Sequence, residues 1–84
     1  MRIALKLFAS LVDRLPPEAR AGHRIDLEVE TGSTVQDMIR RQGIPDELCA
    51  IVLVDGHWVD RKDRAARVLL EGEVLLIWPP VAGG

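Results

Sequence analysis

The spacing of apolar residues predicts strands at three places in the chain. Residues 2–8 carry apolar side chains on both faces, with Ile3, Leu5 and Leu7 on one of them, which is typical of a strand in the middle of a sheet. Residues 23–29 alternate between apolar and charged side chains, which predicts a half-solvated strand near a sheet edge. Residues 74–78 are continuously apolar and predict a closing strand.

Two segments have the features of helices. Residues 9–15 predict a short helix that Pro16-Pro17 would end, because proline cannot continue a helical backbone. The main helix is expected to start after Ser33, which with Gln36 three residues later fits a capping box. Gly43 follows at the position of a left-handed terminator.

The remaining segments are turns and a hairpin. Residues 50–54 form an apolar run that ends at Asp55-Gly56, a strong two-residue hairpin signal that predicts a paired strand over residues 57–60. The charged residues 61–67 are expected to form a helical turn or loop, and residues 70–73 a tight turn.

The order of elements predicts an α+β fold of the β-grasp, or ubiquitin-like, type. One main helix covers only one face, so we expect it to pack across a mixed sheet of about five strands. Strands 2–8 and 74–78 are best placed side by side in the middle, which would bury Leu76. The 84 residues make one domain, which we divide into a β-grasp domain over residues 1–78 and an extended tail over residues 79–84.

The tail ends in Pro79, Pro80, Val81, Ala82, Gly83 and Gly84. The two prolines fix φ and favour an extended path away from the body of the domain. The two glycines remove every Cβ near the terminal carboxylate. The tip would therefore fit a narrow tunnel in a partner and present an unhindered carbonyl carbon at Gly84.

Composition excludes several classes of function. The chain is 48% hydrophobic and 29% charged, with a formal net charge of -2, so no dominant basic field exists to bind nucleic acid or an anionic membrane. A single cysteine excludes an intramolecular disulfide and a metal cluster built on thiolates. The start of the chain lacks the features of a secretory signal, and no apolar run has the ~20 residues that span a bilayer. We expect a cytoplasmic protein that binds no metal.

No self-sufficient active site is apparent. His23 and His57 are isolated, and no carboxylate or nucleophile stands at the spacing of a triad or an acid–base pair. Cys49, between Leu48 and Ala50, is interpreted as a small core residue. We therefore expect the chain not to be an enzyme by itself.

Two further groups of side chains have structural or binding interpretations. The basic residues at positions 61, 62, 64 and 67 alternate with Asp60 and Asp63, which predicts a solvated charged face. Tryptophan is favoured at binding surfaces, but Trp58 and Trp78 both lie on predicted strands, so core packing is an equal possibility.

Several short motifs together resemble the MoaD/ThiS family of ubiquitin-like sulfur carriers. In chain order they are Leu7-Phe8-Ala9, Gly32-Ser33-Thr34-Val35, Val54-Asp55-Gly56, Leu70-Glu71-Gly72-Glu73-Val74 and the tail from Pro79 to Gly84. The Pro-Pro-Val-Ala-Gly-Gly ending is the most specific of them and is most similar to the small subunit of molybdopterin synthase. Asp55 stands where the family often has asparagine, and Trp78 is bulkier than the residue expected before the prolines.

The resemblance implies a function for the tail. An E1-like adenylating enzyme would use ATP to activate Gly84, and a sulfur donor protein would convert it to a thiocarboxylate. The large catalytic subunit of molybdopterin synthase would then receive the sulfur for the pterin precursor, and this chain would bind no cofactor. Other sulfur-transfer pathways (thiamine, cysteine or tRNA thiolation), a ubiquitin-like protein modifier and a non-catalytic β-grasp interaction module remain as alternatives.

Overall fold

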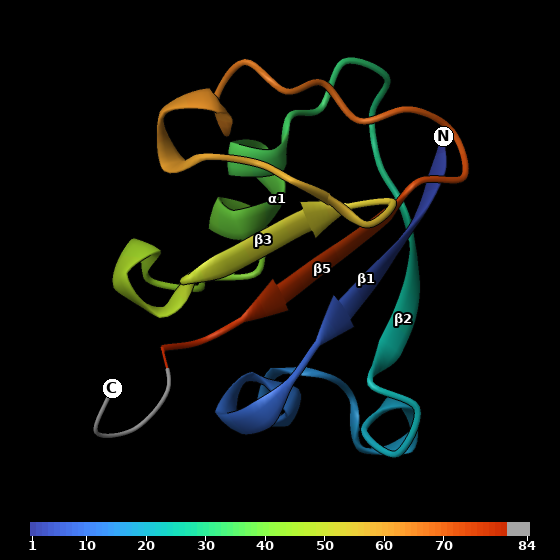
Figure 1. The fold of residues 1–84 in the computed structure, drawn as a ribbon. Coiled ribbons are helices and arrows are strands. Elements are labelled where there is room, and N and C mark those ends of the chain that lie inside the picture. Colours follow the sequence, from blue (N-terminus) through green and yellow to red (C-terminus); the bar gives the residue numbers. More distant parts are fainter. Residues whose placement is uncertain (81–84) are drawn as a thin grey trace.

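The computed structural model describes residues 1–80 and contains a five-stranded sheet with the spatial order β2-β1-β5-β3-β4 (Figure 1). The strands are β1 (Arg2–Leu7), β2 (Arg24–Glu28), β3 (Ile51–Val54), β4 (His57–Trp58) and β5 (Val74–Trp78). Strand β2 lies at one edge of the sheet, as its alternating sequence predicts. Strand β4 lies at the other edge and ends two residues earlier than predicted.

The first and last strands form the centre of the sheet. β1 and β5 are parallel, and Leu5 lies opposite Leu75 and Leu7 opposite Ile77. The other three strand pairs are antiparallel, so the sheet is mixed. This arrangement, with one main helix, confirms the predicted β-grasp fold.

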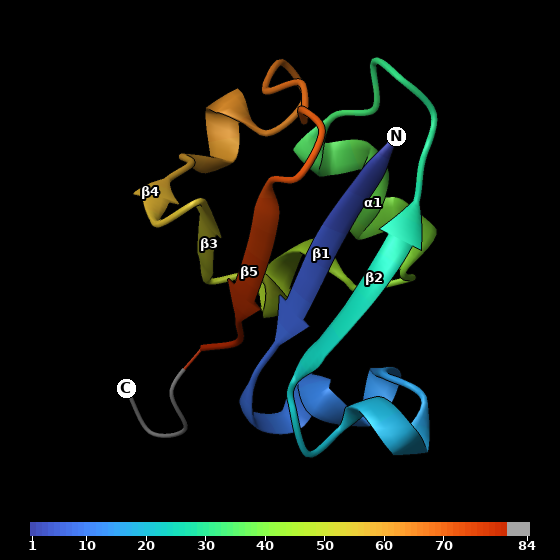
Figure 2. The ribbon, with the colours of Figure 1, turned by 90° about the vertical axis from the view of Figure 1, so that its right-hand side faces the viewer.

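The helix α1 (Val35–Arg41) crosses one face of the sheet (Figure 2). The prediction that Ser33 and Gln36 cap it was wrong by one residue. Thr34 Oγ1 accepts a hydrogen bond from Asp37 N at 3.1 Å, and Asp37 Oδ2 accepts one from Thr34 N at 2.9 Å. Gly43 has a φ of 69° just beyond the helix, which confirms its role as terminator.

The position of the cap depends on a contact that is distant in sequence. Leu69 N donates to Ser33 O at 2.8 Å, and Thr34 forms an isolated β-bridge with Val68. These contacts keep the backbone extended through Thr34, so the helix begins one residue later. Ser33 Oγ instead donates to Glu30 O at 2.7 Å.

Short 3-10 helices occupy the connections. The predicted helix at 9–15 is a 3-10 helix over Ala9–Arg14, and Pro17–Ala19, Asp46–Leu48 and Arg61–Asp63 form single turns. The Asp55-Gly56 hairpin is confirmed, with φ values of 49° and 83°, which match a turn that needs left-handed residues at both central positions. No helix among residues 1–80 has the length and apolar character needed to cross a bilayer.

The core lies between the sheet and α1. Leu75 and Ile77 are fully buried there together with Val35, Met38 and Ile39 from the helix. The prediction for Leu76 was wrong, because it points to the opposite face of the sheet and is only half-buried. β5 is central in the sheet, but its side chains still alternate between a buried face and an open one.

Arg64 departs from the predicted solvated charged face. It is 2% exposed, and its backbone carbonyl accepts a hydrogen bond from Gln36 N at 3.0 Å. Nε and Nη1 of Arg64 are buried without a protein partner among residues 1–80, and burial lowers the pKa of its guanidinium. Arg67, from the same charged run, pairs with Glu73 through hydrogen bonds of 2.7 and 3.2 Å.

Candidate functional site

The tail begins at the end of the central strand. Trp78 O accepts a hydrogen bond from Ala50 N at 3.0 Å, and Pro79, which has no N–H, ends the pairing of β5. Pro79 is buried and Pro80 is exposed. Pro79 is therefore packed against the domain, and Pro80 is the first exposed residue of the tail; the extended path of the tail beyond them stays a prediction.

The other four predicted tail residues, Val81, Ala82, Gly83 and Gly84, lie outside the described residues. Their assignment as the reactive end and partner-binding segment stays a prediction. What the structure supplies is the position from which they start: the end of β5, where that strand lies between β1 and β3.

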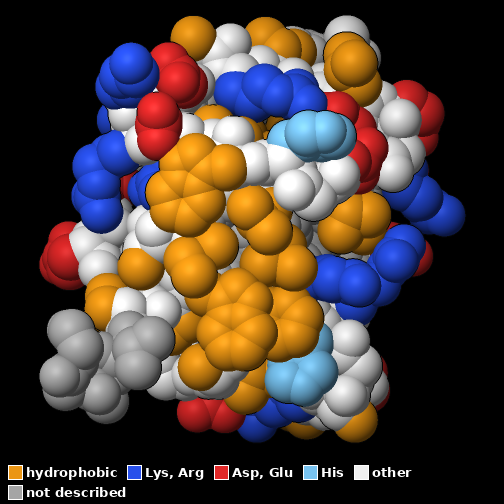
Figure 3. Space-filling model, viewed as in Figure 1, with side chains coloured by type: hydrophobic (Ala, Val, Ile, Leu, Met, Phe, Trp, Pro, Cys, Tyr) orange, Lys and Arg blue, Asp and Glu red, His pale blue; other side chains and the backbone are white. Residues whose placement is uncertain are grey.

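An apolar surface covers the side of the sheet that faces away from α1 (Figure 3). We call it the open face, and it consists of Phe8, Ile51, Leu53, Trp58, Leu76 and Trp78. Trp58 is 56% exposed and Trp78 40% exposed. Both tryptophans are therefore surface residues and not part of the core, which favours the interpretation as a binding surface.

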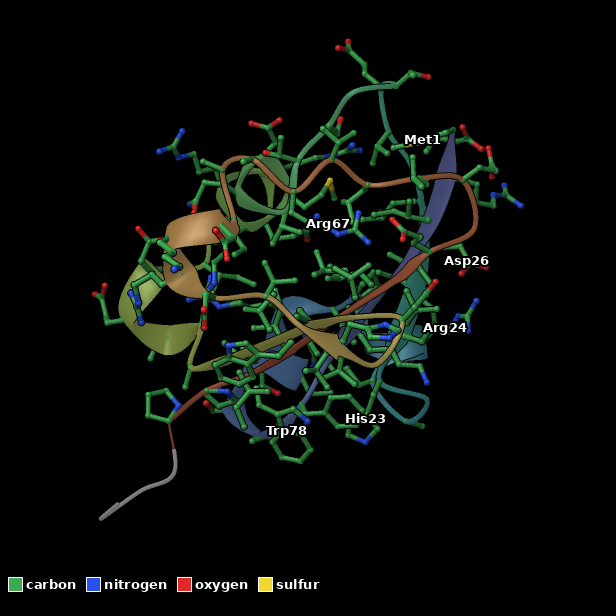
Figure 4. The ribbon with its side chains drawn as sticks, turned by 45° about the horizontal axis from the view of Figure 1, so that its top comes forward. Met1, His23, Arg24, Asp26, Arg67 and Trp78 are labelled. Atoms are coloured by element: carbon green, nitrogen blue, oxygen red, sulfur yellow. The ribbon has the colours of Figure 1, made fainter. Side chains whose placement is uncertain are left out.

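Three rings stand in a row at the end of the open face where the tail begins. The Phe8 ring stacks on His23 with a centroid distance of 4.8 Å and on Trp78 with one of 4.7 Å. The planes differ by only 12° and 5°. We call these three residues the aromatic row; Figure 4 shows two of them, His23 and Trp78, at the same end of the sheet.

The backbone around the aromatic row is held by hydrogen bonds to its neighbours. His23 O accepts from Leu7 N at 3.0 Å, and His23 Nδ1 donates to Leu7 O at 3.2 Å. Phe8 N donates to Ile77 O at 3.3 Å. The row therefore joins the ends of β1 and β5 and the start of β2.

Charged side chains flank the open face at the β1–β2 edge. Lys6 lies opposite Arg24 on β2 and opposite Leu76 on β5. Arg24 Nε is 3.2 Å from Asp26 Oδ1, so part of its charge is neutralised (Figure 4). The surface thus has an apolar centre and a charged rim, the usual composition of a protein–protein interface.

The described residues contain no other arrangement that suggests chemistry. Cys49 is fully buried, as predicted, and burial raises the pKa of its thiol, so little of the reactive thiolate forms at neutral pH. In residues 1–80 no cluster of three or more His, Cys, Asp or Glu side chains is suited to hold a metal ion.

Phe8 and His23 were not identified as site residues from the sequence. Strand alternation places Phe8 on the face opposite Leu7, and Leu7-Phe8-Ala9 is one of the motifs shared with sulfur carriers. Those two signals, taken together, would have pointed to Phe8 as a surface residue of interest. His23 gave no such signal, because its contact with Phe8 depends on the β1–β2 pairing.

Solved structures with the same fold come from several microorganisms. The Haloferax volcanii protein HVO 2177 has a TM-score of 0.75 and 28% identity, with 100% of this chain and 87% of that chain covered. SAMP1, the small archaeal modifier protein 1 of the same organism, has a TM-score of 0.68 and 23% identity, with 100% of both chains covered. A chain in a complex of subunits 1 and 2 of molybdopterin-converting factor from Helicobacter pylori has a TM-score of 0.59 and 16% identity, again with 100% of both chains covered.

The identities of the last two structures establish only the common fold. No curated protein matches the chain by sequence. The model of the ThiS family matches residues 5–84, which is nearly the whole sequence and includes the open face, the aromatic row and the tail. The chain belongs to the ThiS family.

Proposed function

We propose that this protein is a sulfur carrier whose Gly84 carboxylate is activated and converted to a thiocarboxylate. The observation that carries the proposal is the position of the tail. Its first exposed residue, Pro80, lies two positions after the end of the central strand β5, whose last residue Trp78 belongs to the apolar open face. A partner that covers the open face would therefore meet the tail at its edge.

The length of the tail suits insertion into such a partner. Since Pro79 is buried, the segment proposed to enter a partner spans residues 80–84. At up to ~3.5 Å per residue, residues 80–84 reach roughly 17 Å when extended. That distance is enough to pass from a docked surface into a buried active site, and glycines at the tip would allow a narrow passage.

The chemistry requires two partners in sequence. A carboxylate is a poor electrophile, so an E1-like enzyme would join Gly84 to the AMP part of ATP and release pyrophosphate. A sulfur donor at the oxidation level of sulfide then displaces AMP and leaves a thiocarboxylate. Its anionic sulfur attacks a carbon of the acceptor and displaces an oxygen leaving group. Water then cleaves the acyl–sulfur bond, which leaves the sulfur on the acceptor and restores the Gly84 carboxylate, so the carrier can be used again.

The acceptor we favour is the pterin precursor of the molybdenum or tungsten cofactor. The Pro-Pro-Val-Ala-Gly-Gly ending is most similar to the small subunit of molybdopterin synthase. The Helicobacter pylori structure is a complex of two subunits of molybdopterin-converting factor, which supports a second, larger subunit as a partner of this chain.

A second candidate function is protein modification. The fold is shared with small archaeal modifier protein 1 from Haloferax volcanii, and the acyl carbon of an activated Gly84 is also open to attack by a deprotonated lysine amine. Isopeptide-linked conjugates of this chain in cell lysate, absent when Gly83 and Gly84 are deleted, would support this function.

The test of sulfur transfer is the mass of the intact protein. Incubation with ATP, the activating enzyme and a sulfur donor should exchange one oxygen for one sulfur, and fragmentation should place that sulfur on Gly84. Measurement of the untreated protein first establishes that Gly84 is the mature C-terminus. The Cys49→Ala variant should react equally, because Cys49 is buried.

Two results would contradict the proposal. Sulfur found on Cys49 as a persulfide would mean that the Cys49 thiol, and not the Gly84 carboxylate, carries the sulfur. Full partner affinity and pathway activity after deletion of Gly83 and Gly84 would mean that the protein is a β-grasp interaction module whose tail has no role in the reaction. Gly83→Val separates folding from reaction, because it adds a side chain to the tip and leaves the core untouched; we expect it to abolish sulfur delivery.

A further inference from the structure

Three non-glycine residues among residues 1–80 have a left-handed backbone. They are Ala9, His23 and Asp55, with φ values of 51°, 58° and 49°. Asp55 is explained by its hairpin turn, in which this conformation is required. Ala9 and His23 lie in no such hairpin, and this conformation costs free energy in residues with a Cβ.

Both residues belong to the neighbourhood of the aromatic row. Ala9 directly follows Phe8, and His23 is itself a member of the row. The left-handed turn at Ala9 ends the extended path of β1 immediately after Phe8, and the chain continues into the 3-10 helix Ala9–Arg14. His23 is held in its turn by two hydrogen bonds with Leu7. The two left-handed residues thus lie next to, or within, the stacked pair Phe8–His23.

The aromatic row in turn fixes the last residue before the tail. One face of Trp78 stacks on Phe8, and its strand neighbour on the other side is Ile51 of β3. The next residue, Pro79, is buried and has a φ that its own ring restricts. One face of the exposed Trp78 side chain is therefore covered by Phe8, and the φ of the buried Pro79 is restricted, while Pro80 is exposed.

We propose that the aromatic row is a positioning device, which sets the direction in which the chain leaves β5 at Pro79 and Pro80 relative to the open face. Phe8 and His23 are positioning residues that act through Trp78. The use of this direction by an activating partner rests on the proposed function, whereas the direction itself is a property of the free protein. Misplacement of a reacting group by about 1 Å can cost on the order of a hundredfold in rate, so a fixed direction would favour turnover.

A test on the free protein needs no partner. Spin labels are attached to cysteines introduced at Arg40, which is exposed on α1, and at Gly84, in a Cys49→Ala background. The distribution of label–label distances is measured for the intact row, for Phe8→Leu and for His23→Leu. We expect both leucine variants to broaden or shift the distribution, and the ring-preserving His23→Phe to retain it.

Matched controls separate positioning from general loss of structure. Leu53→Ala removes apolar surface from the open face outside the row and should leave the distance distribution unchanged. Urea denaturation identifies any variant that fails to fold. If Phe8→Leu does not fold, His23→Leu still tests the inference, because His23 lies at the end of the row and contacts only one of the other two rings. Identical distributions for the folded leucine variants and the intact row would overturn the inference.

A second measurement connects the row to the reaction. With the carrier as the varied substrate, His23→Leu, a substitution outside the open face, should lower the kcat of adenylation by on the order of tenfold, while KM stays within about twofold. Leu53→Ala should instead raise KM. If the wild-type protein is not adenylated at all, the proposed function fails, but the distance measurements still decide the inference. Unchanged kcat in variants with broadened distributions would remove the role in turnover.

Discussion

The two faces of β5 predict opposite outcomes for the same substitution at neighbouring residues. Leu75 is fully buried between the sheet and α1, whereas Leu76 is half-buried on the open face. Truncation of Leu75 to alanine loses about 2.4 kcal/mol of transfer free energy at ~0.8 kcal/mol per methylene. A residual cavity in the packed core increases the loss in the free energy of unfolding to about 3–4 kcal/mol.

Leu76→Ala should cost no more than about 1 kcal/mol. The removed carbons are already partly in contact with water, and solvent fills the space on an open surface, so no cavity forms. A domain of this size has a total stability of roughly 4–13 kcal/mol. The difference in the free energy of unfolding between the two variants is therefore a large fraction of the total stability.

Urea denaturation followed by circular dichroism measures both variants. Leu75→Ala should shift the midpoint strongly with little change in the m-value, since the surface exposed on unfolding is nearly the same. Equal losses for both variants, or a larger loss for Leu76→Ala, would mean that the face of β5 towards the core has been misassigned.

Other predictions concern single interactions. Thr34→Ala should reduce the free energy of unfolding by ~1 kcal/mol through loss of the cap, and Ser33→Ala by less than about 0.5 kcal/mol; thermal denaturation of both variants would show the order. Arg64→Met should raise stability by about 1–3 kcal/mol, because it replaces a buried guanidinium of which Nε and Nη1 have no protein partner among residues 1–80; a stability loss would contradict the reasoning. Arg67→Met should instead lower stability by ~1 kcal/mol. Hydrogen bonds from Arg67 lower the pKa of Glu73, so its contribution to stability is present above its unfolded-state pKa of ~4.3 and is lost as the pH falls through the lower folded value. Between pH 7 and pH ~3 the wild type should therefore lose more stability than Glu73→Gln does. Equal losses in the two proteins would exclude the Arg67–Glu73 pair as a source of acid sensitivity.

Local sequence patterns were sufficient for most of the fold. The central position of β1 and β5 followed from apolar side chains on both faces, and the hairpin from Asp55-Gly56, because both signals depend on residues close in the chain. The capping box was misplaced because Ser33 and Thr34 are both good caps. The choice between them depends on hydrogen bonds to residues 68–69.

Features that depend on the fold as a whole were not predictable. In a strand that is apolar throughout, alternation does not say which face is buried, so Leu76 was placed in the core. The burial of Arg64 follows from the packing of the Arg61–Asp63 turn against the start of α1, and its sequence neighbours are all polar or small. The tail was identified from its residues alone, whereas the aromatic row at its base required the pairing of three strands.

The adjacency of β1 and β5 has a consequence for the order of events in folding. These strands are about seventy positions apart in the chain, and contacts at such separation raise contact order and slow folding because a long loop must close first. β5 also pairs with β3. A nascent chain that lacks residues 74–78 therefore cannot join β1 and β2 to β3 and β4 in one sheet, and its open face is incomplete. The domain can therefore complete its fold only once its last strand has been synthesised.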